Sequence, residues 1–154
     1  MRWNQGRSQI DTMLADGLLE RVSASREHAD LLIEQARRHL ESARTTARAD
    51  PEGAFGTLYD AGRKGLWAVL ANQGLRPTRR GGHLAVYHAV MAQLDPPMGE
   101  ALRPFDRMRR QRHAAEYPDL HTPRLSAEDL DDDLPKVEAI VTIAQTVMDR
   151  MSVY

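Results

Sequence analysis

The residue types best suited to chemistry are concentrated in one segment, from Leu102 to Tyr117. This segment contains a histidine, a glutamate, a tyrosine and five arginines, namely Arg103, Arg107, Arg109, Arg110 and Arg112. Arginine binds phosphate through paired hydrogen bonds, histidine moves protons near neutral pH, and tyrosine donates hydrogen bonds or stacks on bases. Together these groups could bind RNA and cleave it through its 2′-hydroxyl without a metal ion.

The apolar stripe of this segment is interrupted by a charged residue. At helical spacing, one side of the segment carries Ala101, Phe105, Met108, Arg112 and Ala115. Arg112 thus occupies a position where an apolar side chain is expected, and burial of its charge requires a partner. Glu116 lies one turn further on and can supply the carboxylate.

The neighbours of Arg112 complete a candidate site on adjoining faces of one helix end. His113 lies one turn from both Arg109 and Tyr117. We predict that the catalytic residues are Arg112, His113 and Tyr117, and that the substrate-binding residues are Arg109, Glu116 and Arg107. A structural network of ion pairs is the alternative interpretation, and residue types alone favour it.

The net charge hides an uneven distribution along the chain. The formal charge of the 154 residues is −1, which by itself gives no sign of a nucleic-acid partner. Basic residues cluster in segments 76–80 and 103–112, whereas acidic residues gather in segment 128–133. A basic patch is therefore expected if the acidic segment folds elsewhere.

Several classes of protein and site are disfavoured. The chain has no cysteine, which excludes disulfides and thiolate metal sites and fits a reducing cytoplasm. No apolar run approaches the roughly 20 residues of a membrane span, and the N-terminus leads into no signal core. His83 and His88 lack the one-turn spacing that favours metal ligation. We expect a cytoplasmic protein without a membrane segment, metal site or cofactor.

Apolar residues recur at helical spacing along almost the whole chain, without strand-like alternation of useful length. Ser25 is expected to cap one helix and Asp50, before Pro51, the next, which Gly74 ends. Further helices are predicted over residues 8–15, 83–94 and 102–117.

The last helix is expected to begin at Asp132 or Asp133, just before Pro135, with Ser126 capping only a short turn. The fold class is therefore all-α, an antiparallel helical bundle of four to five main helices plus a short N-terminal helix. We divide the chain into an N-terminal extension, 1–24, and the bundle, 25–154.

Gly62 and Gly65 lie inside one predicted helix, where each glycine costs roughly 1 kcal/mol relative to alanine. Close approach of another helix, including one from a partner subunit, would explain them. The alternative is a tolerated imperfection, and the sequence does not decide between the two.

Three segments of the chain form a recognisable set. The main one is RRQRHAAEYP, residues 109–118. Supporting segments are YDAGRK, residues 59–64, and GLRP at 74–77 followed by Gly81, Gly82 and His83. Together they resemble the HEPN superfamily of small helical nucleotide-binding domains. The resemblance covers about residues 25–117, and the last helix would complete an HEPN-like bundle. It is closest to a stand-alone bacterial branch that ends in Arg-Asn/His-x-x-Glu-Tyr-Pro.

The resemblance implies metal-independent ribonuclease activity, because many HEPN proteins pair an arginine with a histidine after four to six intervening positions and work as dimers. Arg112 matches the motif arginine and His113 the polar residue after it, whereas Tyr117 stands at the histidine position. Some members are toxins that pair with a nucleotidyltransferase-type antitoxin. The resemblance thus implies a homodimer, RNA as substrate, and such an antitoxin as a partner.

The sequence leaves three functions open, and with them the question of whether the chain is an enzyme. The first is an RNA-binding HEPN domain acting as a metal-independent endoribonuclease. The second is a catalytically inactive interaction module or antitoxin-associated scaffold, which Tyr117 in place of histidine favours. The third is a small-ligand-binding bundle, for which only generic clefts between helices argue.

Overall fold

The computed structural model describes residues 3–154, in which six helices and one short antiparallel sheet are formed. The elements are α1 (Arg7–Ala15), β1 (Leu19–Arg21), α2 (Arg26–Thr46), α3 (Pro51–Gln73), β2 (Leu75–Pro77), α4 (Gly82–Leu94), α5 (Gly99–Glu116) and α6 (Ala127–Met148). The predicted all-α fold, with a short first helix and up to five main helices, is confirmed.

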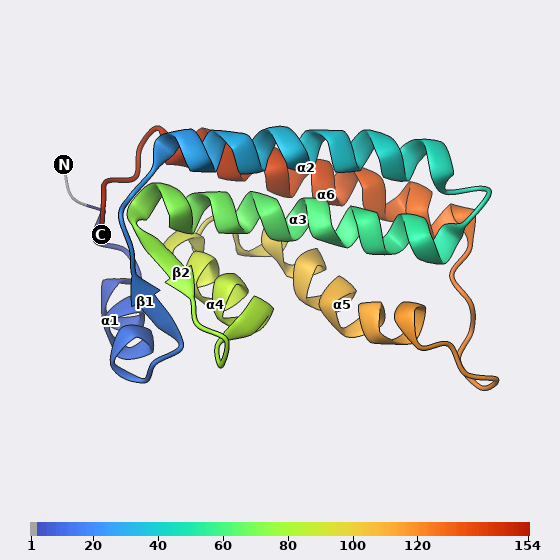
Figure 1. Cartoon of the computed structure of the whole chain (residues 1–154), viewed down its shortest axis with the longest axis horizontal. Helices are drawn as coiled ribbons and strands as arrows, with labels where there is room; N and C mark the ends of the chain where they lie inside the picture. Colours follow the sequence, from blue (N-terminus) through green and yellow to red (C-terminus); the bar gives the residue numbers. More distant parts are fainter. Residues whose placement is uncertain (1–2) are drawn as a thin grey trace.

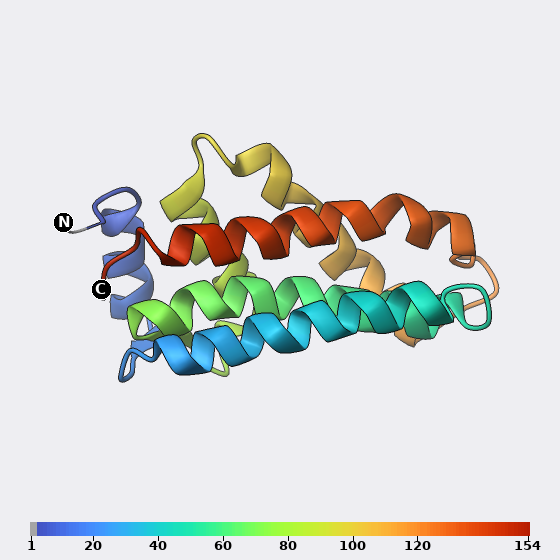
Figure 2. The same cartoon turned by 90° about the horizontal axis from the view of Figure 1, so that it is seen from above.

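Helix α3 lies at the centre of the bundle and contacts α2, α4, α5 and α6. Figure 1 shows α2 and α6 along one side of α3 and α4 and α5 along the other. The long helix α2 runs opposite to α3 and α6, which run in the same direction (Figures 1 and 2). Because neighbours surround it, α3 buries side chains on most of its faces, and Gly62 and Gly65 are buried as well.

Gly62 and Gly65 allow other elements to approach the α3 backbone closely. A Cβ at Gly62 would lie 3.3 Å from Phe105 Cδ2 of α5, and one at Gly65 would lie 3.3 Å from Val141 Cγ2 of α6. The close approach therefore comes from helices of the same chain.

The predicted helix caps at the starts of α2 and α3 are present. The Ser25 hydroxyl accepts from the His28 backbone N–H at 3.0 Å, and Asp50 Oδ1 accepts from the Gly53 N–H at 3.0 Å. Gly74 ends α3 with a positive φ of 81°, a conformation that glycine adopts without strain. These three residues determine where α2 begins and where the antiparallel helix α3 begins and ends.

The predicted start of the last helix was wrong. Ser126 caps α6 itself, through a capping box with Asp129, and the helix continues past Pro135 to Met148. Proline removes one backbone hydrogen bond, but burial of Leu130, Leu134 and Val137 on the same helix keeps the segment helical. Asp133 is consequently a buried residue in the second turn of α6 and not a helix cap.

The two strands were not predicted, since three residues are too few to show alternation. Glu20 of β1 pairs with Arg76 of β2, and their side chains form an ion pair at 2.6 Å. Helix α1 packs on α4 and buries Ile10 and Met13 in the shared core. The separation of residues 1–24 from the bundle stays a prediction.

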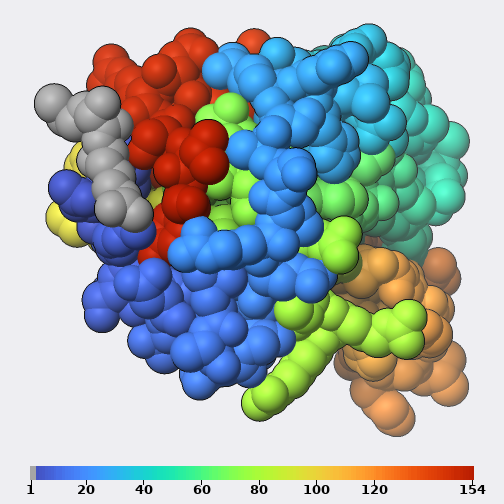
Figure 3. Space-filling model, turned by 60° about the vertical axis from the view of Figure 1, so that its left-hand side comes forward, coloured from blue at the N-terminus to red at the C-terminus, as the bar shows by residue number. Residues whose placement is uncertain are grey.

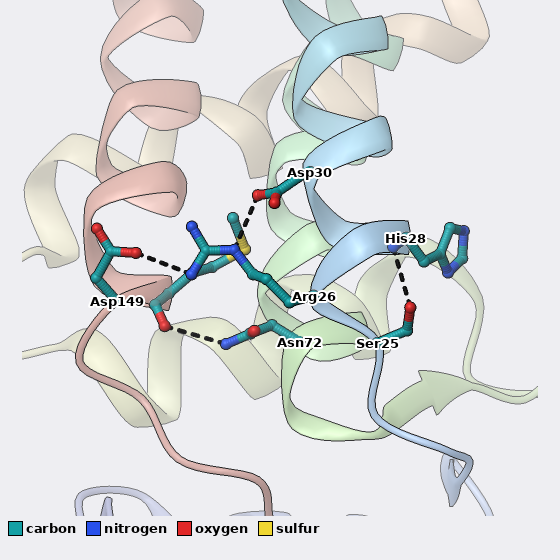
Figure 4. A network of polar contacts seen from close by, with 7 residues as sticks. Ser25, Arg26, His28, Asp30, Asn72 and Asp149 are labelled. Atoms are coloured by element: carbon teal, nitrogen blue, oxygen red, sulfur yellow. Dashed lines mark hydrogen bonds and ion pairs between the residues drawn. The ribbon is translucent and has the colours of Figure 1, made fainter.

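Polar contacts join the start of α2 to the end of α6 (Figure 4). Arg26 contacts Asp30 and Asp149, each at 2.8 Å, and the Asn72 side chain donates to the Met148 carbonyl at 3.2 Å. The hydrogen bonds that Arg26 donates to Asp30 and Asp149 raise the pKa of its guanidinium. These contacts hold α2, α3 and α6 in register at this end of the bundle.

Across residues 3–154, every helix is too short or too polar to cross a membrane.

Candidate functional site

A groove lies where the first turn of α4 meets the second half of α5. It has a volume of about 330 Å³ and is lined by Gly81, His83, Leu84, Arg109, Arg112, His113 and Glu116. Figure 3 shows the lime segment before α4 standing beside the orange end of α5. Four of the six predicted site residues line this groove, namely Arg109, Arg112, His113 and Glu116.

Arg112 is held between two neighbours at the edge of the groove. Its Nη2 forms an ion pair with Glu116 Oε1 at 2.9 Å, and its Cζ lies 5.2 Å from the centre of the Tyr59 ring. About a third of its side chain, 36%, remains exposed. The apolar stripe thus leads to a guanidinium that keeps hydrogen-bond donors free for a ligand.

Tyr59 of α3 connects the groove to the core. Its ring is fully buried and stacks on Phe105 of α5, with ring centres 5.1 Å apart. Its hydroxyl forms a hydrogen bond of 2.8 Å with Nδ1 of His83. Burial raises the pKa of the phenol to about 12, against the opposing effect of Arg112. Tyr59 therefore stays neutral and supports both Arg112 and His83.

The imidazole of His83 lies near the positively charged side chains of three arginines. Burial lowers its pKa below the ordinary value of 6.5, and the guanidiniums of Arg63 and Arg112 lower it further, with a smaller effect from Arg109. Asp60 opposes the shift. His83 is therefore neutral at pH 7 and can accept a proton.

Arg109, His113 and Tyr117 are spaced one turn apart along α5 and its C-terminal cap. Arg109 forms an ion pair with Asp106 at 3.0 Å. His113 is exposed and packs its ring against Tyr117, with ring centres 5.0 Å apart. Tyr117 is the residue that ends α5 and is 66% exposed. It lies beside His113 outside the lining of the groove.

Arg107 lies away from the groove. Its guanidinium binds both carboxylate oxygens of Asp133 on α6, and its Nη1 also donates to Gln111 at 2.7 Å. It lines a separate hollow between α5 and α6. The structure thus does not bring Arg107 together with the other predicted site residues, because it projects from a different face of α5.

Sequence reasoning missed Tyr59, His83 and Arg63 as site residues. All three residues lie in the segments that carry the family resemblance, but the resemblance assigned no role to them. Their distance from Arg112 in the sequence hid the contact, which depends on α3, α4 and α5 meeting. Among residues 3–154 no three histidine or acidic side chains converge in a metal-binding arrangement.

Comparison with known proteins gives one match. The model of the HEPN domain family matches residues 29–150, a range that contains α3, α4, α5 and the whole groove. Searches of curated proteins and of solved structures found no match. Since the match spans most of the chain and its helices form the expected bundle, this chain belongs to the HEPN domain family.

Proposed function

We propose that this protein binds RNA in the groove between α4 and α5 and cleaves it there without a metal ion. HEPN membership supports an RNA-related or nuclease-like function in general. The observation that carries the specific proposal is the placement of Arg112, about one-third exposed and fixed by Tyr59 and Glu116, at the edge of a groove that also contains His83 and Arg109.

The charges around the groove suit a phosphate chain. Arg109 and Arg112 line it, and each guanidinium has five N–H donors, of which its carboxylate partner uses only some. Arg79 and Arg80 are exposed in the loop that leads to Gly81 at one end of the groove. A backbone of successive phosphates could contact both sets of arginines, which supports RNA as the ligand.

We further propose that the active form is a homodimer. Two large apolar side chains are exposed in these segments: Leu84, which lines the groove, at 37%, and Leu120, in the loop after α5, at 99%. Exposed apolar groups next to a polar site favour contact with a second subunit. A nucleotidyltransferase-type antitoxin as a partner and a cytoplasmic location stay predictions.

The test compares two arginine variants. Arg112→Ala removes the groove guanidinium, and Arg38→Ala removes a similar one-turn arginine–glutamate pair on α2. Binding of labelled single-stranded RNA is measured against salt concentration, and cleavage of RNA is followed in EDTA. We expect Arg112→Ala to weaken binding at least about tenfold and to abolish cleavage, and Arg38→Ala to match the wild type. Wild-type binding that is absent or insensitive to salt would rule out the proposal.

A second function, the catalytically inactive interaction module, is favoured by the exposed Tyr117 at the motif's histidine position. In that case Arg112 and Glu116 would serve an interface between subunits or partners. Arg112→Ala would then dissociate the subunits or lower the free energy of unfolding. An Arg112→Ala protein that remains folded and keeps the wild-type oligomeric state, but no longer binds RNA, would exclude this alternative.

A further inference from the structure

The proposed cleavage of RNA requires a base that removes the proton of a ribose 2′-hydroxyl. Three side chains that line the groove have suitable chemistry: His83, His113 and Glu116. The carboxylate of Glu116 is already engaged in the ion pair with Arg112. His113 is exposed to solvent, and its ring packs against the exposed ring of Tyr117. His83 differs because it is partly buried and fixed at one nitrogen.

The position of His83 is set by two elements. It is the second residue of α4, and its Nδ1 forms the 2.8 Å hydrogen bond with the buried Tyr59 hydroxyl of α3. With Nδ1 carrying the proton and donating it to Tyr59, the lone pair of Nε2 is left for the groove. A base held by a third group in this way is the arrangement used to activate a hydroxyl nucleophile.

Charged groups from each neighbouring element shape the protonation of this imidazole. Helix α3 contributes Arg63 and Asp60, and α5 contributes Arg112 and Arg109. Burial and these three arginines outweigh Asp60, so His83 is neutral at pH 7 before a phosphate binds. Once His83 has taken up a proton, a bound phosphate can balance the new charge.

We propose that His83 is the catalytic base of the groove, supplying from α4 the imidazole that Tyr117 does not provide. This inference rests on the proposed function of RNA binding. Nε2 of His83 takes the proton of the 2′-hydroxyl, and the 2′-oxygen forms a bond to the adjacent phosphorus. The bond from phosphorus to the 5′-oxygen breaks, and this oxygen leaves with a proton from water. The products are a 2′,3′-cyclic phosphate and a 5′-hydroxyl, and His83 returns its proton to solvent.

The experiment uses the full chain, a defined single-stranded RNA and buffer with EDTA. Binding and the cleavage rate are measured for the wild type, His83→Gln, His83→Ala and the control His88→Ala. His88 is exposed on the same helix and outside the groove lining. Glutamine preserves a hydrogen bond to Tyr59 but cannot accept the proton, and alanine leaves room for imidazole added to the solution.

We expect both His83 variants to bind RNA within about twofold of the wild type and to cleave it at least about 100-fold more slowly. Added imidazole should restore cleavage by His83→Ala but not by His83→Gln, and His88→Ala should cleave normally. The wild-type rate should fall only as the pH falls below about 6.5, because the pKa of His83 is lowered and protonated His83 cannot act as a base.

Two results would overturn the assignment of His83. One is cleavage at the wild-type rate by folded His83→Gln, and the other is a wild-type protein that binds RNA in a salt-dependent way without cleaving it. The second result leaves RNA binding intact and removes only the catalytic step. Absence of both binding and cleavage would instead remove the proposed function, and this inference with it.

Discussion

The guanidinium of Arg112 lies over the ring of Tyr59, with 5.2 Å between Cζ and the ring centre. The same tyrosine holds His83 through its hydroxyl and stacks on Phe105 in the core. A single buried side chain on the central helix therefore determines where two groove residues from different helices stand. This arrangement allows positioning effects to be separated from direct contacts with a ligand.

The Tyr59 hydroxyl is expected to be a positioning group. Tyr59→Phe keeps the stacked ring but frees His83 to rotate, so kcat for RNA cleavage should fall about tenfold, the value of one hydrogen bond, with KM within about twofold. Tyr87→Phe is the matched control, since Tyr87 is also buried against Phe105 but lies outside the groove lining. Equal effects of the two substitutions on kcat would contradict this role.

The ion pair between Arg107 and Asp133 should stabilise the packing of α5 on α6. Asp133 is only 7% exposed, whereas Arg107 is 38% exposed and can reach water when its partner is lost. Asp133→Asn is therefore expected to lower the free energy of unfolding by about 2 kcal/mol, less than for a fully buried pair. In thermal unfolding the Tm should fall by about 4–8 °C.

Asp132→Asn is the control for this substitution, because Asp132 is the exposed neighbour on the same helix. Its Tm should remain within about 1 °C of the wild type. RNA binding should be unchanged in both variants, since Arg107 lies outside the groove. A loss of RNA binding in Asp133→Asn without unfolding would place Arg107 back among the substrate-binding residues.

Two glycines of α3 should respond in opposite ways to alanine. A Cβ at Gly56 meets no atom within 4 Å, so Gly56→Ala should stabilise the helix by about 0.5–1 kcal/mol. A Cβ at Gly65 would lie 3.3 Å from Cγ2 of Val141, and this fully buried side chain has little room to move aside. Gly65→Ala should destabilise the protein by about 1 kcal/mol despite the gain in helix propensity. Urea unfolding measures both, and stabilisation by Gly65→Ala would show that α6 moves away easily.

The lowered pKa of His83 predicts a dependence of stability on pH. The unfolded chain takes up the proton as the pH falls through about 6.5, whereas the folded protein resists it until a lower pH. The unfolded state then binds more protons, so the contribution of His83 to stability is present above pH 7 and is lost as the pH falls below about 6.5.

This prediction is checked by the Tm of the wild type and His83→Gln between pH 8 and pH 5. Glutamine does not titrate, so the wild type should lose stability relative to His83→Gln on acidification. The pKa of His39 is also lowered, by burial and by Lys64, but this residue is present in both proteins and its effect cancels. A constant difference in Tm across this range would contradict the shift.

Local sequence determined the helices and much of one site. Ser25, Asp50 and Gly74 bond to backbone groups within a few residues, so their capping roles could be predicted without knowing the fold. Glu116 lies one turn from Arg112 on the same helix, and the ion pair between them followed from helical spacing alone. Pro135 was the exception, because burial of its helix outweighed its local preference.

Tertiary structure decided what meets Arg112 from other helices and which arginines share its groove. Tyr59 and His83 come from α3 and α4, and their contact depends on the packing of helices far apart in sequence. Arg107 and Arg109 are two positions apart and therefore face about 200° away from each other, so Arg107 binds Asp133 while Arg109 lines the groove. Spacing specifies the face of a helix, but only packing specifies what lies opposite that face.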